Sequence, residues 1–212
     1  MTVNRTRLAG WALLIGAIVA TAGYLAAGTL VHGHGDARFT SALWTPLTGI
    51  AIAGAIITAL GLPVILTYHG RLAPRLTLVG YVGMFATIVM LNISEGCIEA
   101  FVKPYLATHG GVPKNPPPGL AVFENIALVC LVVGLICLGI AVIRARVFPR
   151  WTGALFIASP IAGFLPLPGP FAMLSDYLAF IAIITIGLQV VRTESRRPEP
   201  TPALAHSAPA TP

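Results

Sequence analysis

Residues 120–143 read LAVFENIALVCLVVGLICLGIAVI and hold one charged side chain, Glu124, in 24 positions. About 20 apolar residues in a helix span the hydrocarbon core of a bilayer, so this run is long enough to cross it. The whole 212-residue chain is similar: 56% of its residues are hydrophobic, 9% are charged and the mean hydropathy is +0.86. A soluble domain carries about 25% charged residues. The composition therefore predicts an integral membrane protein and excludes a cytosolic enzyme or a nucleic-acid-binding protein.

Five further stretches have a similar apolar character. The predicted fold is an all-α integral membrane bundle of six transmembrane helices within residues 1–191, over Leu8–Val31, Pro46–Thr67, Leu76–Val102, Leu120–Ile143, Trp151–Leu165 and Phe171–Val191. The fifth stretch is short and contains Pro160, so we expect it to be kinked or only partly inserted. Residues 192–212 lose the apolar pattern and are rich in Pro and Ala, which predicts a disordered cytoplasmic tail.

The basic residues indicate the orientation, because cytoplasmic loops of membrane proteins are enriched in Lys and Arg. With six spans, ten of the thirteen basic residues fall on one side of the membrane, and Arg38, Lys103 and Lys114 fall on the other. We therefore expect a multi-pass protein of the cell membrane with both termini in the cytoplasm.

Small residues recur at helical spacing in two of the predicted spans. Ala12, Gly16 and Ala20 form one stripe, and Gly49 and Ala53 form another. Helices in lipid pack closely where small residues let their backbones approach, so both stripes predict packing within the bundle. A homodimer formed through one of them is the alternative.

Four of the seven acidic residues fall inside predicted spans, where an ionisable side chain is costly and usually faces a cavity or a partner. Asn92, Glu95, Glu99 and Lys103 recur on one stripe of the third span, and the last two are spaced for an i,i+4 ion pair. The four acids lie at similar depth, toward the outer ends of their helices: Glu95, Glu99, Glu124 and Asp176. We expect them to share one polar site in the outer half of the bundle; the alternative is that these shallow carboxylates reach water and cap helix ends.

These four acids are the candidate catalytic residues of a membrane-embedded enzyme. Apolar surroundings favour the neutral form of a carboxyl group, so Glu95 or Asp176 is expected to hold a proton and act as a general acid. Aromatic rings at similar depth stabilise a carbocation through their faces, although such rings are also typical of an interfacial belt. The candidate substrate-binding residues are Asn92, Phe101, Phe123, Asn125 and Tyr177. Acid-initiated cyclisation or isomerisation of a lipophilic, isoprenoid-like substrate fits these groups.

The sequence predicts no cofactor and no metal centre. Glu95 and Glu99, with His32 and His34 from an outer loop, are suitable ligand types for a metal ion, but the chain has neither an HExxH nor a Glu-x-x-His pattern. The expected partners are a lipophilic small molecule and membrane lipid, without nucleic acid. Two other functions stay open: a small proton-coupled carrier, and a non-catalytic accessory membrane subunit.

Three stretches resemble a broad group of small, uncharacterised bacterial membrane proteins with about six helices. They are RLAGWALLIGAI at residues 7–18, IEAFVKPYLA at residues 98–107 and RARVFPRWTGALF at residues 144–156. This resemblance implies the architecture and no activity. The stretch NISEGCIE at residues 92–99, the size and the intramembrane acids are similar to those of small transmembrane terpene cyclases, which start their reactions by protonation. That similarity implies an acid-initiated reaction and assigns no residue a role.

Overall fold

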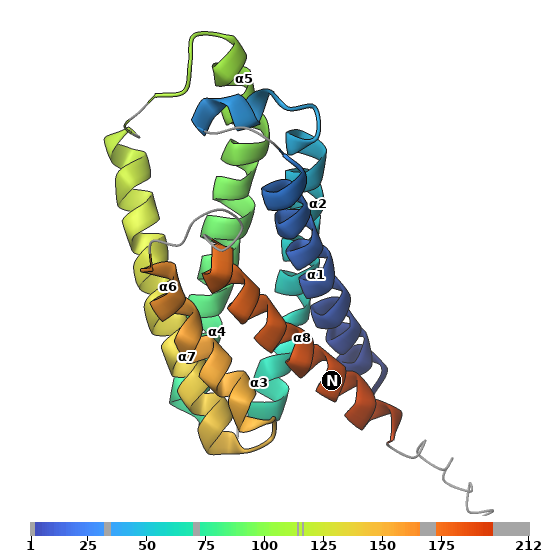
Figure 1. Cartoon of the computed structure of the whole chain (residues 1–212). Coiled ribbons are helices and arrows are strands. Elements are labelled where there is room, and N and C mark those ends of the chain that lie inside the picture. Colours follow the sequence, from blue (N-terminus) through green and yellow to red (C-terminus); the bar gives the residue numbers. More distant parts are fainter. Residues whose placement is uncertain are drawn as a thin grey trace, which may run out of the picture.

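The computed structural model describes residues 3–31, 35–69, 73–113, 115, 117–165 and 173–196. Every regular element in this part of the chain is a helix (Figure 1). Five helical stretches are long and apolar enough to cross a membrane: Arg5–Leu30, Trp44–Tyr68, Pro74–Thr108, Pro118–Ala145 and Leu174–Ser195. The all-α class is confirmed, and the chain has several helices suited to spanning a membrane.

Helices α1 (Val3–Leu30) and α2 (Trp44–Gly61) pack with their backbones almost in contact. A Cβ atom added to Gly54 would lie 2.3 Å from the backbone N of Ala20, and one added to Gly16 would lie 2.5 Å from the backbone N of Thr58. The stripe that contains Gly16 and Ala20 therefore packs within the bundle, as predicted.

The stripe formed by Gly49 and Ala53 does not pack within the bundle, so this prediction was wrong. A Cβ added to Gly49 would meet no atom within 4 Å, and Ala53 is exposed. At 3.6 residues per turn, positions five apart lie on different sides of a helix. Helix α2 uses the side that carries Gly54, so Gly49 faces away from α1.

The remaining helices are joined by similar close crossings. A Cβ on Gly83 of α4 (Pro74–Thr87) would lie 2.4 Å from the Cα of Gly134 on α6 (Pro118–Ala145). A Cβ on Gly139 would lie 2.6 Å from the backbone O of Gly153 on α7 (Arg150–Gly163). On the other side, a Cβ on Gly187 of α8 (Leu174–Ser195) would lie 2.7 Å from the backbone N of Leu14 on α1. These contacts set the helices at fixed separations.

The third membrane-spanning stretch is not a uniform α-helix. After α4 the chain continues as two π-helical segments, η2 (Ile88–Glu95) and η3 (Ile98–Val102), and ends in α5 (Lys103–Thr108). A short 3₁₀ helix, η1 (Gly35–Thr40), precedes α2 and contacts α5. The end of the bundle that carries η1 and α5 is called the outer end, after the orientation predicted above, and the opposite end is called the inner end.

The predicted fifth span, Trp151–Leu165, is short, as expected, and it is not among the five stretches long enough to cross a membrane. Helix α7 has 14 residues, so its length is about 21 Å, against a hydrocarbon core of about 30 Å. Pro160 lies inside this helix. Figure 1 shows α7 ending and α8 beginning partway along the bundle, below the outer ends of α5 and α6. The space between those outer ends is therefore not filled by α7 or α8.

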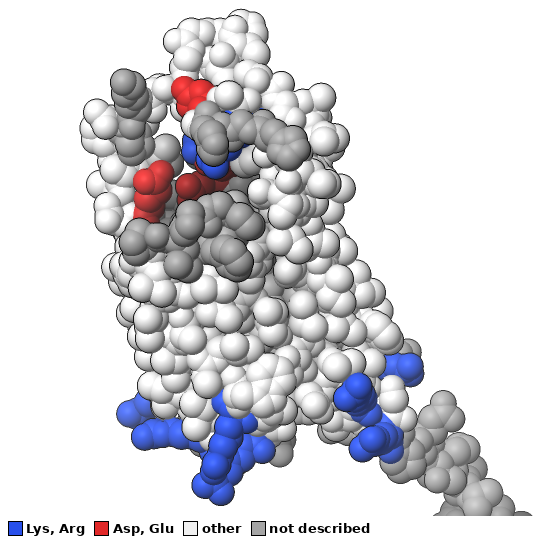
Figure 2. Space-filling model, in the orientation of Figure 1, with Lys and Arg blue, Asp and Glu red and all other residues white. Residues whose placement is uncertain are grey.

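The inner end gathers most of the positive charge. Figure 2 shows most of the visible Lys and Arg side chains there, and Figure 1 shows the start of α1 and the end of α8 at this same end. Helix α8 continues to Ser195, four residues beyond the predicted boundary at 191, and Glu194 accepts a 2.6 Å hydrogen bond from the Tyr68 hydroxyl on α3 (Pro63–His69). The rest of the predicted tail, residues 197–212, lies outside the described residues, as do His32 and His34.

The α1–α2 crossing predicts opposite effects for two glycines of one helix. Gly54→Ala places a methyl group against the backbone of α1 and should destabilise the fold by roughly 1–3 kcal/mol. Gly49→Ala meets open space and should leave stability unchanged or slightly raised, since Ala favours helices more than Gly does. Unfolding of the purified protein in mixed micelles, followed by circular dichroism, measures both; equal effects would contradict the packing described.

Candidate functional site

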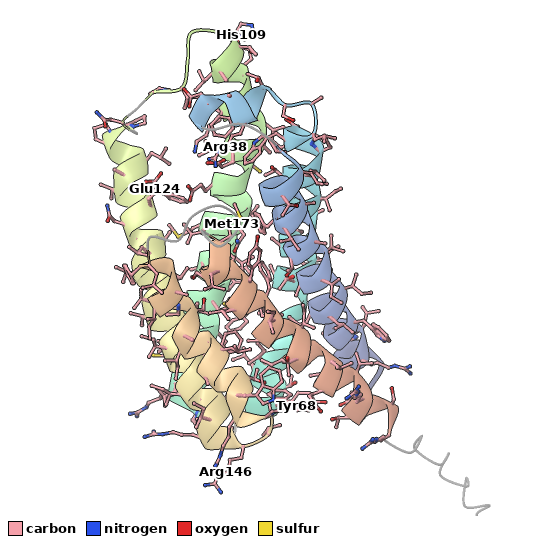
Figure 3. The ribbon with its side chains drawn as sticks, viewed as in Figure 1. Arg38, Tyr68, His109, Glu124, Arg146 and Met173 are labelled. Carbon is pink, nitrogen blue, oxygen red and sulfur yellow. The ribbon has the colours of Figure 1, made fainter. Side chains whose placement is uncertain are left out.

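A cavity of about 330 Å³ lies in the outer half of the bundle, between α1, α2, the π-helical segments, α6 and the ends of α7 and α8. This volume is at the small end of the range of about 300–1,000 Å³ that is typical of ligand pockets. Most of its wall is apolar, and the polar lining residues are Tyr24, Thr48, Asn92, Glu95, Glu99, Ser175 and Asp176. Figure 2 shows acidic side chains inside a hollow of this half, and Figure 3 shows Arg38, Glu124 and Met173 in the same half, far from Tyr68 and Arg146.

Three of the four predicted acids therefore meet at one cavity: Glu95, Glu99 and Asp176. They come from two separate membrane-spanning stretches, the π-helical segments and the first turn of α8. Asn92, predicted to bind substrate, lines the same cavity. The expectation of a shared polar site in the outer half agrees with this geometry for these four residues.

Asn92 connects α1 to α8 across the cavity wall. Its side chain is 6% exposed, and its Nδ2 atom donates to the Tyr24 hydroxyl at 3.3 Å and to Oδ1 of Asp176 at 3.4 Å. The Tyr24 hydroxyl in turn donates to the backbone O of Asn92 at 3.4 Å. Asn92 therefore supplies the donor that a carboxyl group needs in apolar surroundings.

Glu95 has a different environment. Its side chain is partly exposed toward the cavity, and no described residue forms a hydrogen bond or an ion pair with its carboxyl group. The charges of Glu99, Glu124 and Asp176 act on it electrostatically, and the Lys103 ammonium acts in the opposite sense. Glu95 is thus the acid of this cavity that other described groups of the protein do not bind directly.

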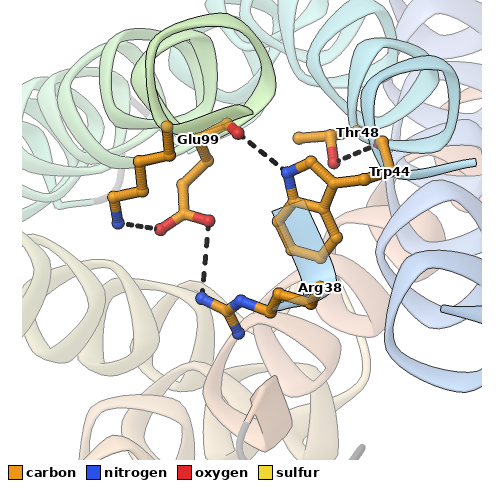
Figure 4. Close-up of polar contacts among 5 residues, drawn as sticks. Arg38, Trp44, Thr48 and Glu99 are labelled. Carbon is orange, nitrogen blue, oxygen red and sulfur yellow. Dashed lines mark hydrogen bonds and ion pairs between the residues drawn. The ribbon is translucent and has the colours of Figure 1, made fainter. Parts of the chain in front are cut away.

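Glu99 is held by cations, as Figure 4 shows. Its Oε1 atom pairs with Lys103, which confirms the predicted i,i+4 ion pair, and its Oε2 atom lies 3.6 Å from Nη2 of Arg38 on η1. Its backbone O accepts a 2.8 Å hydrogen bond from Nε1 of Trp44. Glu99 is thus the acid of this cavity that pairs with two described cations.

Aromatic rings complete this cluster around Arg38. The guanidinium carbon lies 4.7 Å from the ring centre of Phe39 and 5.0 Å from that of Trp44, while these two rings meet edge to face at 5.3 Å. Cation–π contacts of this kind stabilise a cation that has lost water. The cluster fixes η1 over the outer end of the cavity.

Two of the three cavity acids lie in π-helical segments, Glu95 in η2 and Glu99 in η3. A π turn closes hydrogen bonds from residue i to i+5, so it carries one residue more than an α turn between bonded groups. The Ser94 hydroxyl donates at 2.8 Å to the backbone O of Val89, five residues earlier. Asn92 and Glu95 of η2 and Glu99 of η3 line the same cavity, as expected for residues on one stripe, and Glu99 pairs with Lys103. Such segments are frequent at functional sites.

The other predicted site residues do not line this cavity. Glu124 is half-buried on α6 and acts on Glu95 electrostatically. Phe101 is 57% exposed on the outside of the bundle, and Phe123 is half-buried. Asn125 is exposed and donates to the backbone O of Ala121 at 2.7 Å. The Tyr177 hydroxyl is buried and has no hydrogen-bond partner among the described residues.

Sequence reasoning did not identify Tyr24, Trp44 and Ser175, which also line the cavity. Tyr24 and Trp44 are aromatic residues toward the outer ends of the first two spans, a position that is also typical of an interfacial belt. Ser175 lies in the first turn of α8. Its backbone O accepts a 2.8 Å hydrogen bond from the Ser159 hydroxyl on α7. The one sequence feature that could have identified Ser175 as a cavity residue is its position next to Asp176.

No family model, no curated protein and no solved structure matches this chain. In the part of the chain that the structure describes, no three His, Cys, Asp or Glu side chains are grouped so that they could hold a metal ion. The histidines that were considered as ligands, His32 and His34, are not among those residues.

The Asn92 contacts predict a large effect for one asparagine and a small effect for another. Asn92→Leu removes the donor to Asp176 and leaves that carboxyl group without its amide partner, which should cost about 1–3 kcal/mol of stability. Asn125→Leu removes a side chain that bonds only within its own helix, and it should change stability by less than about 0.5 kcal/mol. The free energy of unfolding in mixed micelles is measured for both variants. Similar losses of stability would show that the Asn92 contacts do not stabilise the fold.

Proposed function

We propose that this protein is a membrane-embedded enzyme in which a carboxyl group donates a proton to a lipophilic, isoprenoid-like substrate and so cyclises or isomerises it. The observation that carries the proposal is the carboxyl group of Glu95, which faces a mainly apolar cavity and has no hydrogen-bond or ion-pair partner among the described residues. Such surroundings favour a protonated acid that is available to a bound molecule.

The reaction begins with proton transfer from Glu95. The O–H bond of its carboxyl group breaks and a C–H bond forms at one carbon of a substrate double bond, which leaves a carboxylate and a carbocation. A carbon next to the cation then loses a proton to Asp176 or back to Glu95, and the double bond forms at a new place. If a second double bond attacks the cation first, the product is a ring. Substrate and product have the same formula.

The cavity wall supports the cationic intermediate. The rings of Tyr24 and Trp44 line the cavity, and an aromatic face attracts a positive charge. The amide of Asn92 holds Asp176 in place through its 3.4 Å hydrogen bond. Phe101, Phe123 and Tyr177 were expected to bind substrate, but the cavity rings that could contact it are those of Tyr24 and Trp44.

The position of the cavity favours an enzyme over a carrier. Carrier sites usually lie near the middle of the membrane between internal repeats, whereas this cavity lies in one half of the bundle, beyond the end of α7. The charge distribution supports placement in the cell membrane with both termini in the cytoplasm, because the inner end collects the arginines. The cavity would then lie on the side of the outer leaflet.

Solvent deuterium provides the test, because a carboxyl group exchanges its proton with water. The purified protein in phosphatidylcholine nanodiscs is incubated in D₂O with farnesol, squalene or a polyprenol, and the lipids are analysed by mass spectrometry. The wild type should yield isomerised or cyclised products that contain carbon-bound deuterium. Glu95→Gln or Asp176→Asn should lower that yield at least about 100-fold, since positioned acids contribute roughly 10²–10⁴-fold to rate.

Asp36→Asn is the matched control, because it removes one carboxylate at the same end of the molecule but on the exposed surface of η1. It should leave deuterium incorporation unchanged. Full incorporation in both cavity variants, or none from any of the three lipids with the wild type, would refute the proposal.

A further inference from the structure

The charges around the cavity are strongly one-sided. Three carboxyl groups line it, those of Glu95, Glu99 and Asp176, and no Lys or Arg is among its described lining residues. The outer end as a whole repeats this imbalance: five described acids lie there against two described cations, Arg38 and Lys103. A positive ligand group stabilises the ionised form of these carboxyl groups, as the carbocation does once Glu95 has given up its proton, whereas a phosphate meets three acids and no Lys or Arg among the described lining residues.

The two cations at this end are already engaged. Both pair with Glu99, and the Arg38 guanidinium also lies over the rings of Phe39 and Trp44. The Lys103 ammonium lies 5.6 Å from the ring centre of Phe39. Neither cation is among the described lining residues of the cavity, so an anionic head group inside it would meet Glu95 and Asp176 without compensation.

A metal bridge between a phosphate and these carboxylates is not supported by the geometry, because no three suitable side chains are grouped for a metal ion in the described part. A positive head group, by contrast, would find groups in the cavity wall that attract it. The Glu95 carboxyl group has no partner among the described residues, Asp176 is bound by a neutral amide, and the ring of Tyr24 lies in the same wall.

We propose that the cavity binds lipophiles that carry a positive charge, such as an alkyl ammonium group or the carbocation of the reaction, in preference to the same chain with a phosphate head. This inference rests on the proposed function in that it names the charge class its ligand must have. It also separates the roles of the acids: Glu95 and Asp176 face the ligand charge, and Glu99 neutralises Arg38 and Lys103.

Fluorescence of Trp44 measures the preference directly. The chain has three tryptophans, and Trp11 and Trp151 are 41% and 52% exposed, whereas Trp44 is 4% exposed and lines the cavity. The variant with Trp11→Phe and Trp151→Phe leaves Trp44 as the only reporter. Three probes share one chain that ends in a quenching bromine: ω-bromoundecyl trimethylammonium, ω-bromoundecanol and ω-bromoundecyl phosphate. Phosphatidylcholine nanodiscs keep the surface charge of the bilayer near zero.

Quenching of Trp44 should be saturable, and the ammonium probe should reach half-maximal quenching at a concentration at least about tenfold lower than the phosphate probe does. Glu95→Gln and Asp176→Asn, made in the same background, should each weaken the ammonium probe about tenfold and leave the alcohol probe unchanged. Asp36→Asn should alter neither probe. Unchanged binding of the alcohol shows that a variant keeps its cavity.

Equal binding of the phosphate and ammonium probes by the wild type would overturn the inference, as would unaltered ammonium binding in both cavity variants. Deuterium incorporation into farnesol without an ammonium preference would remove this inference and leave the proposed reaction in place. An ammonium preference without deuterium incorporation would remove the reaction and leave the charge selectivity.

Discussion

The cost of a carboxyl group in an apolar bundle is the constraint on which this structure depends. The three acids that line the cavity differ in the interactions that offset this cost. Glu99 is compensated by two cations, Arg38 and Lys103, and Asp176 receives a hydrogen bond from Asn92. Glu95 receives neither from the described residues and is exposed to the cavity instead. All three acids line the cavity, but only Glu99 is paired with cations. We propose separate roles on this basis, in which Glu99 neutralises Arg38 and Lys103 and the other two acids act on the ligand.

The cavity exists because the packing is tight elsewhere. Glycines hold α1 against α2 and α8, and α6 against α4 and α7, at distances where no side chain fits between the backbones. Those crossings fix the frame, and the short α7 leaves the outer half open where a longer helix would fill it. The π-helical segments depart from regular α-helical spacing at the level of the cavity, and Asn92 and Glu95 line it from η2. A rigid frame with a local irregularity is a common way to place functional groups.

The sequence predicted the membrane-spanning character of the chain and the Glu99–Lys103 pair, because long apolar runs and i,i+4 spacing are local signals. It also predicted that four acids share one site, and three of them line the cavity, without Glu124. It did not predict which side of α2 packs, since a helix that is apolar all round carries no stripe that marks its contact face. Gly49 and Ala53 were misassigned for this reason. The π-helical segments, and the positions of Tyr24 and Trp44 in the cavity wall, depend on tertiary contacts that the spacing of residues in the sequence does not indicate. Glu194 was placed in a tail, although α8 continues through it.

Chemical cross-linking tests the central claim, that Glu95 and Asp176 face one cavity, most directly. Cysteines replace both residues in a background where Cys97, Cys130 and Cys137 are alanine, and a short bis-methanethiosulfonate is added to the protein in nanodiscs. Intact mass should show one bridging reagent per chain for the Glu95→Cys/Asp176→Cys pair and two singly attached reagents for Glu95→Cys/Glu194→Cys, whose positions lie at opposite ends of the bundle. Two singly attached reagents on the first pair would contradict a shared cavity, and with it the chemistry assigned to this protein.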